Sequence, residues 1–110
     1  MGNKGDKLTS MSKEAAEQLL EQLSLITGVT SKKMFGGHGI FCDKKMFGMI
    51  TAKGGMFLKV DDSNRADYEE KGSTKHHRMP YYSIPSEILE DQDLLIEWAG
   101  KSIEIALKKK

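Results

Sequence analysis

The centre of the sequence carries a glycine-rich run, Met34-Phe35-Gly36-Gly37-His38-Gly39-Ile40-Phe41. Apolar and β-branched residues flank the glycines on both sides, which predicts one strand before them and another after them. A loop that cradles a phosphate would instead follow a strand and open a helix. We therefore interpret the glycines as a tight crossing between two strands, where a missing side chain relieves backbone crowding.

Short apolar runs separated by turn signals surround this crossing and predict an antiparallel meander. The connecting turns are too short for a crossover helix, so consecutive strands must be neighbours that run in opposite directions. A fifth strand is expected at residues 79–84, at an edge because Pro80 has no N–H to donate. The four strands of the meander are expected at residues 29–35, 38–42, 46–51 and 56–60.

Helical periodicity appears at both ends of the chain. Apolar residues spaced three and four apart predict a helix that Ser10 or Ser12 caps and that ends shortly before Gly28. Asp91 is the expected cap of a second long helix, over residues 92–108.

Two short helical segments complete the expected order of elements. Asp61 or Asp62 is expected to cap the first of them, and Pro85 suits the first turn of the second. Helices outside an antiparallel sheet predict an α+β, two-layer domain. Because 110 residues is the length of one domain, we expect a flexible tail over residues 1–9 and a single domain over residues 10–110.

The charge of the chain is more informative by region than in total. There are 17 Lys and Arg against 16 Asp and Glu, and this net charge of +1 disfavours a dedicated nucleic-acid binder. Residues 30–59 are nevertheless basic, and residues 61–100 are acidic. A basic meander suits an acidic protein or DNA phosphates, although lysines at strand edges also prevent unwanted pairing.

The candidate interaction surface follows from these charges and from two neighbouring tyrosines. One tyrosine ring should face outward, because neighbours on a strand point to opposite faces. The surface consists of Lys32, Lys33, Lys44, Lys45, Tyr81 and Tyr82. The methionines of the meander are expected to fill the core rather than to form a binding surface. They are Met34, Met46, Met49 and Met56.

No constellation of residues indicates catalysis, a cofactor or a metal. Cys42 is the single cysteine, so no intrachain disulfide can form. His38 and Cys42 share one face of a predicted strand, but a metal site needs three or four ligands, and His76 and His77 are remote in sequence. No signature of a nucleophile and its base accompanies Cys42. We expect no catalytic residue, no cofactor and no metal.

The sequence also predicts where the protein resides. It contains no apolar run of the roughly 18 residues that a membrane span needs, and its first residues lack an apolar leader. A lone thiol suits a reducing compartment. We therefore expect a soluble, cytoplasmic protein that makes no contact with membranes.

The glycine-rich run and several later segments together resemble the TfoX N-terminal domain family. The later segments are Met46-Phe47-Gly48-Met49-Ile50, Met56-Phe57-Leu58-Lys59-Val60-Asp61, Asn64-Arg65-Ala66-Asp67-Tyr68-Glu69, Met79-Pro80-Tyr81-Tyr82, Ile84-Pro85 and the stretch around Trp98. They follow in order over about residues 14–107. The family-like signature is Met34, Phe35, Gly36, Gly37 and Gly39, and we expect its role to be structural.

The resemblance implies a small α+β domain with an antiparallel sheet, and it supplies no catalytic residues. Larger members of the family are bacterial regulators of natural competence, the TfoX and Sxy proteins, which act with the cyclic-AMP receptor protein. Those regulators carry a second, C-terminal domain. This chain ends at Lys110 without one, so we expect a stand-alone domain.

Three functions are open at this point. The leading hypothesis is a non-catalytic regulatory domain that binds a protein partner in transcription regulation and forms a homodimer through an exposed strand edge. The alternative is direct binding of DNA or RNA by the basic meander. The third is a ligand sensor or small enzyme with a cleft around His38, Cys42 and a tyrosine.

Overall fold

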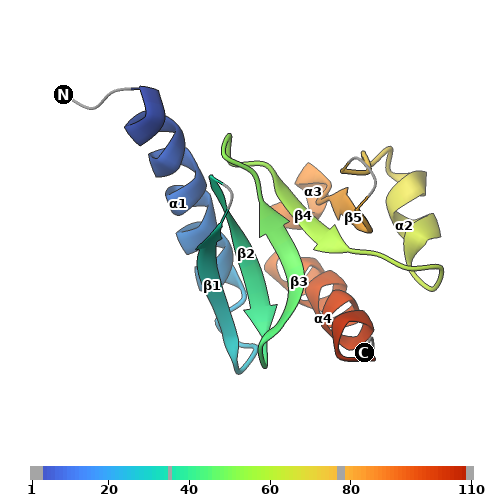
Figure 1. Cartoon of the computed structure of the whole chain (residues 1–110). Helices are drawn as coiled ribbons and strands as arrows, with labels where there is room; N and C mark the ends of the chain where they lie inside the picture. Colours follow the sequence, from blue (N-terminus) through green and yellow to red (C-terminus); the bar gives the residue numbers. More distant parts are fainter. Residues whose placement is uncertain (1–3, 35, 77–78, 109–110) are drawn as a thin grey trace.

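An antiparallel sheet of five strands, in the order β1-β2-β3-β4-β5, forms the centre of the fold (Figure 1). The computed structural model describes residues 4–34, 36–76 and 79–108. In chain order the elements are α1 (Lys4–Gln22), β1 (Val29–Met34), β2 (Gly37–Cys42), β3 (Lys45–Ile50), β4 (Met56–Lys59), α2 (Arg65–Glu70), β5 (Tyr81–Ser83), α3 (Ser86–Leu89) and α4 (Gln92–Lys108). The predicted α+β class, with a five-stranded antiparallel sheet against N- and C-terminal helices, is confirmed.

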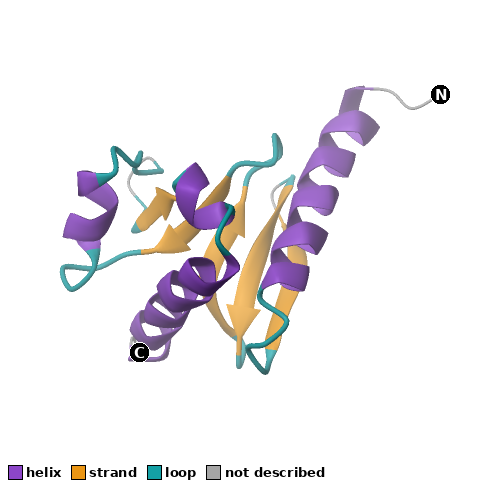
Figure 2. Ribbon diagram, turned by 180° about the vertical axis from the view of Figure 1, so that it is seen from behind, coloured by secondary structure: helices purple, strands orange, loops and turns teal. Residues whose placement is uncertain are grey.

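The two long helices lie against the same face of the sheet (Figure 2). α1 packs on β1 and β2, whereas α4 packs on β3 and β4. Their apolar stripes supply Leu19 and Leu95, which are fully buried and meet Phe47 and Leu58 of the sheet in the core. This arrangement buries the centre of one sheet face, as a two-layer domain requires.

A bulge in the β2–β3 pair changes which side chains share a face. Phe41 lies opposite Met46 and Ile40 lies opposite Gly48, so Phe47 is the extra residue. Phe47 turns into the core, and the alternation of β3 is shifted beyond it. Met46 and Met49 consequently lie on the same face, away from the helices. Without the bulge, residues separated by an odd number of positions would point to opposite faces. A bulge typically re-aims side chains in this way.

The start of α1 differs from the prediction. The helix begins at Lys4 rather than after a cap at Ser10 or Ser12, so most of the segment expected as a tail is helical. Ser12 is fully buried and lies within hydrogen-bond distance of the His38 side chain on β2. A polar residue that we interpreted as a cap therefore fixes the helix against the sheet.

The caps of the later helices are partly as predicted. Asp91 caps α4, because the Leu94 N–H donates to Asp91 Oδ1 at 3.2 Å. Neither Asp61 nor Asp62 caps α2, whose N-cap residue is Asn64. Instead Asn64 Oδ1 accepts a hydrogen bond from the Asp61 N–H at 2.9 Å, which closes a turn ahead of the helix.

The two edges of the sheet are not equivalent. The segment 74–76 pairs with the outer side of β5, because the His76 N–H donates to the Tyr81 carbonyl at 2.8 Å and the Ser83 N–H donates to the Thr74 carbonyl at 2.9 Å. β1 pairs with β2 on one side, and within the described part of the chain no strand pairs with its outer side. The β1 edge is therefore the exposed one.

Candidate interaction surface

The sheet face opposite α1 and α4 carries the candidate site, and no helix of the described residues covers it (Figures 1 and 2). We call this surface the open face. The strand registers place on it the side chains or Cα positions of Thr30, Lys32, Met34, Gly37, Gly39, Phe41, Met46, Met49, Phe57, Lys59, Tyr81 and Ser83. Most of its large apolar side chains are only half-buried.

A hollow of about 360 Å³ lies on the open face. We call it the methionine pocket, because Met34, Met46, Met49 and Met79 line it, together with His76. Beside the pocket, the absence of a side chain at Gly39 lets two of these methionines pack over the backbone. A Cβ atom there would lie 2.6 Å from Met34 Sδ and 3.1 Å from Met46 Sδ. Two thioether sulfurs from different strands thus converge above one glycine.

A second hollow, of about 750 Å³, adjoins the methionine pocket. We call it the lysine hollow, because Lys32 and Lys44 line it beside Phe41. Met34 lines both hollows, which therefore adjoin at its side chain, and we call the two together the track. Asp43 is the one acidic residue that lines either of them among the described residues.

The role predicted for the meander methionines is wrong for three of them. Met34, Met46 and Met49 are half-exposed on the open face, whereas Met56 packs against the core as expected. The sequence signal was present, since methionine is common on adaptable binding surfaces as well as in cores. By contrast, no pattern in the sequence indicates the bulge at Phe47, which puts Met46 and Met49 on one face.

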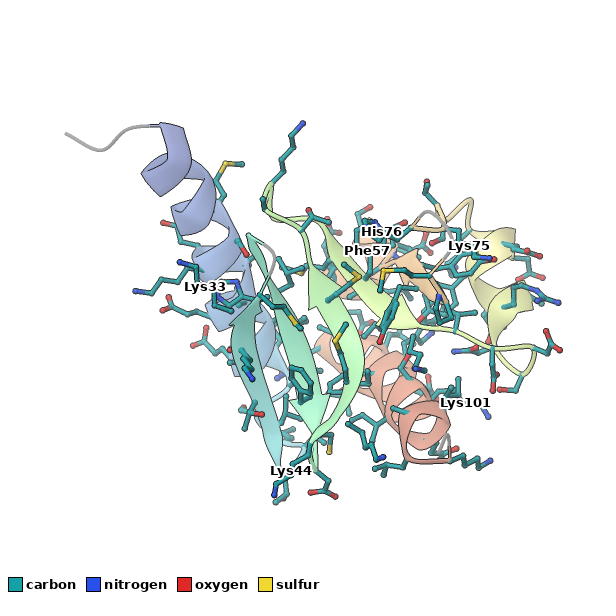
Figure 3. The ribbon with its side chains drawn as sticks, viewed as in Figure 1. Lys33, Lys44, Phe57, Lys75, His76 and Lys101 are labelled. Carbon is teal, nitrogen blue, oxygen red and sulfur yellow. The ribbon has the colours of Figure 1, made fainter. Side chains whose placement is uncertain are left out.

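The four lysines of the predicted surface do not form one patch. Figure 3 shows two of them, with Lys33 beside α1 and Lys44 at the far end of the β2–β3 hairpin. Lys32 lies opposite Gly39 on the open face, whereas its neighbour Lys33 lies opposite His38 on the helix side of the sheet. Lys44 sits in the β2–β3 turn with φ of +70°, and Lys45 lies opposite Cys42. A nucleic-acid backbone could not follow all four at once.

Tyr81 and Tyr82 lie on opposite faces of β5, as strand alternation predicts, but neither ring is exposed to solvent. Tyr82 is 9% exposed and packs beside Tyr68 in the core. Tyr81 points to the open face and is 4% exposed, and Lys59 Nζ lies over its ring, 5.6 Å from the centroid. Burial raises the pKa of Tyr81.

Of the residues considered for catalysis or metal binding, His38 and His76 line the methionine pocket, whereas Cys42 lines neither hollow. Cys42 is buried, and its Sγ lies 3.7 Å from the Thr27 carbonyl oxygen. Burial, and then the charge of Asp43, raise the pKa of the thiol, which disfavours the reactive thiolate. Within the described residues, no three His, Cys, Asp or Glu side chains are placed to hold a metal ion. His77 lies outside the described residues.

The partly buried His38 side chain should make stability depend on pH. Burial, and then the charge of Lys33, lower the pKa of His38 below its ordinary value of 6.5. The unfolded chain therefore binds this proton more readily than the folded protein does. The free energy of unfolding should fall as the pH drops below about 6.5, and this loss should end once the folded-state imidazole is protonated.

Urea unfolding at a series of pH values measures this effect. His38→Gln should show a flatter dependence than the wild-type protein between about pH 7 and pH 5, since only the wild type carries the titrating ring at this position. Subtracting the two curves removes the contribution of the other histidines. Two parallel curves over this window would contradict the prediction.

The glycines of the signature meet different geometric demands. Gly36 has φ of +78° in the turn between β1 and β2, a conformation that favours glycine. A Cβ atom on Gly37 would lie 2.0 Å from the Ile50 carbonyl oxygen, and one on Gly39 would meet the sulfurs of Met34 and Met46. Phe35 lies outside the described residues. These demands favour the structural interpretation of the signature, which stays a prediction.

The fold and the site together define a small α+β domain whose single sheet has one face under helices and one face open. The sequence profile of the TfoX N-terminal domain matches residues 21–106. The chain therefore belongs to the TfoX N-terminal domain family, as predicted, and this family is associated with competence regulation. None of the curated proteins compared with the chain matches it. No helix of the described residues is long and apolar enough to cross a membrane.

Proposed function

We propose that this chain is a non-catalytic regulatory domain that acts by binding another protein through its open face. The observation that carries the proposal is the uncovered sheet face, on which methionine and phenylalanine side chains are only half-buried. A sheet normally buries its apolar face against another layer, and contiguous apolar patches on soluble proteins mark interaction sites.

The side chains of the open face suit a protein partner. Thioether side chains are flexible and polarizable, so Met34, Met46 and Met49 can adapt to an apolar group placed between them. Phe57 stands at the other side of the face, with its ring 5.0 Å from that of His76 (Figure 3). Membership in a family associated with competence regulation supports a regulatory role, with a partner in transcription regulation.

The exposed edge of β1 supports self-association as a second part of the proposal. An unpaired strand edge offers N–H and C=O groups to a copy of itself across a two-fold axis. Pairing two β1 strands brings Lys32 and Lys33 of both copies close together, so their repulsion opposes the homodimer. Sedimentation analysis should show self-association that strengthens as salt is added. A strict monomer at every salt concentration would contradict the homodimer.

Site-specific crosslinking in the bacterial cell tests the open face directly. A photoreactive amino acid at Thr30, which is exposed on the open face, should capture a defined protein. The same amino acid at Glu104, which is exposed on α4, serves as the matched control. Met49→Glu should abolish the capture, because it places a charge in the apolar methionine pocket, and urea unfolding of the variant checks that it still folds. Identical products from both positions, or none from Thr30, would contradict the proposal.

A further inference from the structure

The open face combines an apolar track with positive charge. The methionine pocket provides the apolar end of the track, and the lysine hollow adds Lys32 and Lys44 beside Phe41. Lys59 lies on the same face, above Tyr81. Because Asp43 is the single acid that lines the two hollows among the described residues, this surface is complementary to a ligand that is both apolar and anionic.

The acidic surfaces of the molecule lie elsewhere. A shallow exposed hollow on α1 is lined by Glu14, Glu17 and Glu21. Packing two open faces together would bring the lysines of both copies into contact, which disfavours a symmetric face-to-face dimer. An α1 helix of one copy on the open face of the next would make a head-to-tail contact that does not close. The complementary partner is therefore a different chain.

We propose that the open face binds an acidic segment of a partner protein that carries bulky apolar side chains. This inference rests on the proposed function and names the chemistry of the partner. One apolar side chain of the segment enters the methionine pocket, and a second lies against Phe41. Carboxylates of the segment then reach Lys32 and Lys44, which stand at the margin of the track.

Nucleic acid fits the same surface less well. Phosphates would be attracted by Lys32 and Lys44, but Lys33 lies on the opposite face of β1. The methionine pocket is apolar and offers a phosphate little to bind. Buried interface cores are rich in apolar anchors, with charges at the rim, and the open face has this arrangement.

Selection from a random-sequence peptide library identifies the chemistry that the surface prefers. The full chain is immobilised, and the enriched peptides are sequenced and their affinities measured. They should be rich in Asp and Glu interspersed with bulky apolar residues. Their binding should weaken as salt is added, because the carboxylate–lysine attractions at the rim are screened.

Neighbouring lysines on β1 provide the matched variants. Lys32→Glu, on the open face, should weaken binding of the selected peptides by about three- to tenfold, as expected for a charge reversal at an interface rim. Lys33→Glu changes the net charge equally but lies on the other face, so its effect should stay within about twofold. Met34→Thr keeps a strand-compatible residue, removes the thioether shared by both hollows, and should cost about tenfold.

Several results would overturn the inference. They are the enrichment of neutral or basic peptides, the enrichment of none, and an equal loss of affinity in Lys32→Glu and Lys33→Glu. Tighter binding of a single-stranded DNA oligonucleotide at the open face would assign the surface to nucleic acid instead. Self-association that Lys32→Glu abolishes would assign it to a second copy. If crosslinking at Thr30 succeeds while the peptide selection fails, the acidic segment is wrong and the proposed function stands.

Discussion

Gly37→Ala should reduce the free energy of unfolding by about 3 kcal/mol or more, as expected for a group forced into occupied space. Gly37 begins β2, and β3 passes so closely that an added Cβ would lie 2.0 Å from the Ile50 carbonyl oxygen and 3.2 Å from the Thr51 carbonyl carbon. Both obstructing groups belong to the backbone. The strand itself must shift to admit the methyl group, which disturbs the β2–β3 pairing that begins at His38 and Ile50.

Two other glycines supply the controls for this prediction. Gly39→Ala meets the side chains of Met34, Phe41 and Met46 and no backbone atom among its three nearest neighbours, and side-chain ends can move aside, so its cost should be smaller. Gly100→Ala meets nothing within 4 Å in the interior of α4 and should stabilise the protein by about 0.5–1 kcal/mol. Urea unfolding of the three variants gives the order directly. A Gly37→Ala variant as stable as the wild type would refute the structural interpretation of the signature.

The order of elements could be predicted from the sequence because it rests on local signals. Apolar periodicity indicated the long helices, and glycines with polar residues indicated the turns. The two-residue turn at Asp43 and Lys44 forces β2 and β3 to be antiparallel neighbours. Each of these features depends on a few consecutive residues, so one sequence was enough to locate it. Gly28 does adopt φ of +89°, but it lies directly before β1 and does not cap α1, which ends at Gln22.

The candidate surface could not be predicted in the same way, because it depends on non-local geometry. Strand alternation assigns residues to two faces, but it does not say where the alternation shifts. The bulge at Phe47 depends on how β3 pairs with β2, and that pairing places Met49 opposite Gly39. Tyr81 is a second feature that depends on non-local geometry. Strand alternation predicts that Tyr81 and Tyr82 point to opposite faces, but the burial of Tyr81 depends on the neighbouring strand, which also carries Lys59.

Phe47→Ala should be the most damaging single truncation in the sheet, with a loss of about 3–5 kcal/mol in the free energy of unfolding. The ring has no exposed surface, and it is the largest side chain that the sheet contributes to the fully buried core. Removing it leaves a cavity between the sheet and α4, whose Leu95 is also completely buried. Such a loss is a large part of the total stability of about 5–15 kcal/mol that small domains have.

The same variant should also disturb the open face, because Phe47 is the extra residue of the bulge. Packing of the residue 47 side chain in the apolar core stabilises the bulge, and an alanine side chain is too small to provide that packing. A shift of β3 by one residue would move Met49 toward the core and remove one wall of the methionine pocket.

Phe47→Leu, which retains an apolar anchor, should therefore be less destabilising than Phe47→Ala and should keep peptide binding. Leu25→Ala, at a side chain that is 76% exposed, should stay within about 0.5 kcal/mol of the wild type. Equal losses in Phe47→Ala and Leu25→Ala would show that this ring does not anchor the core.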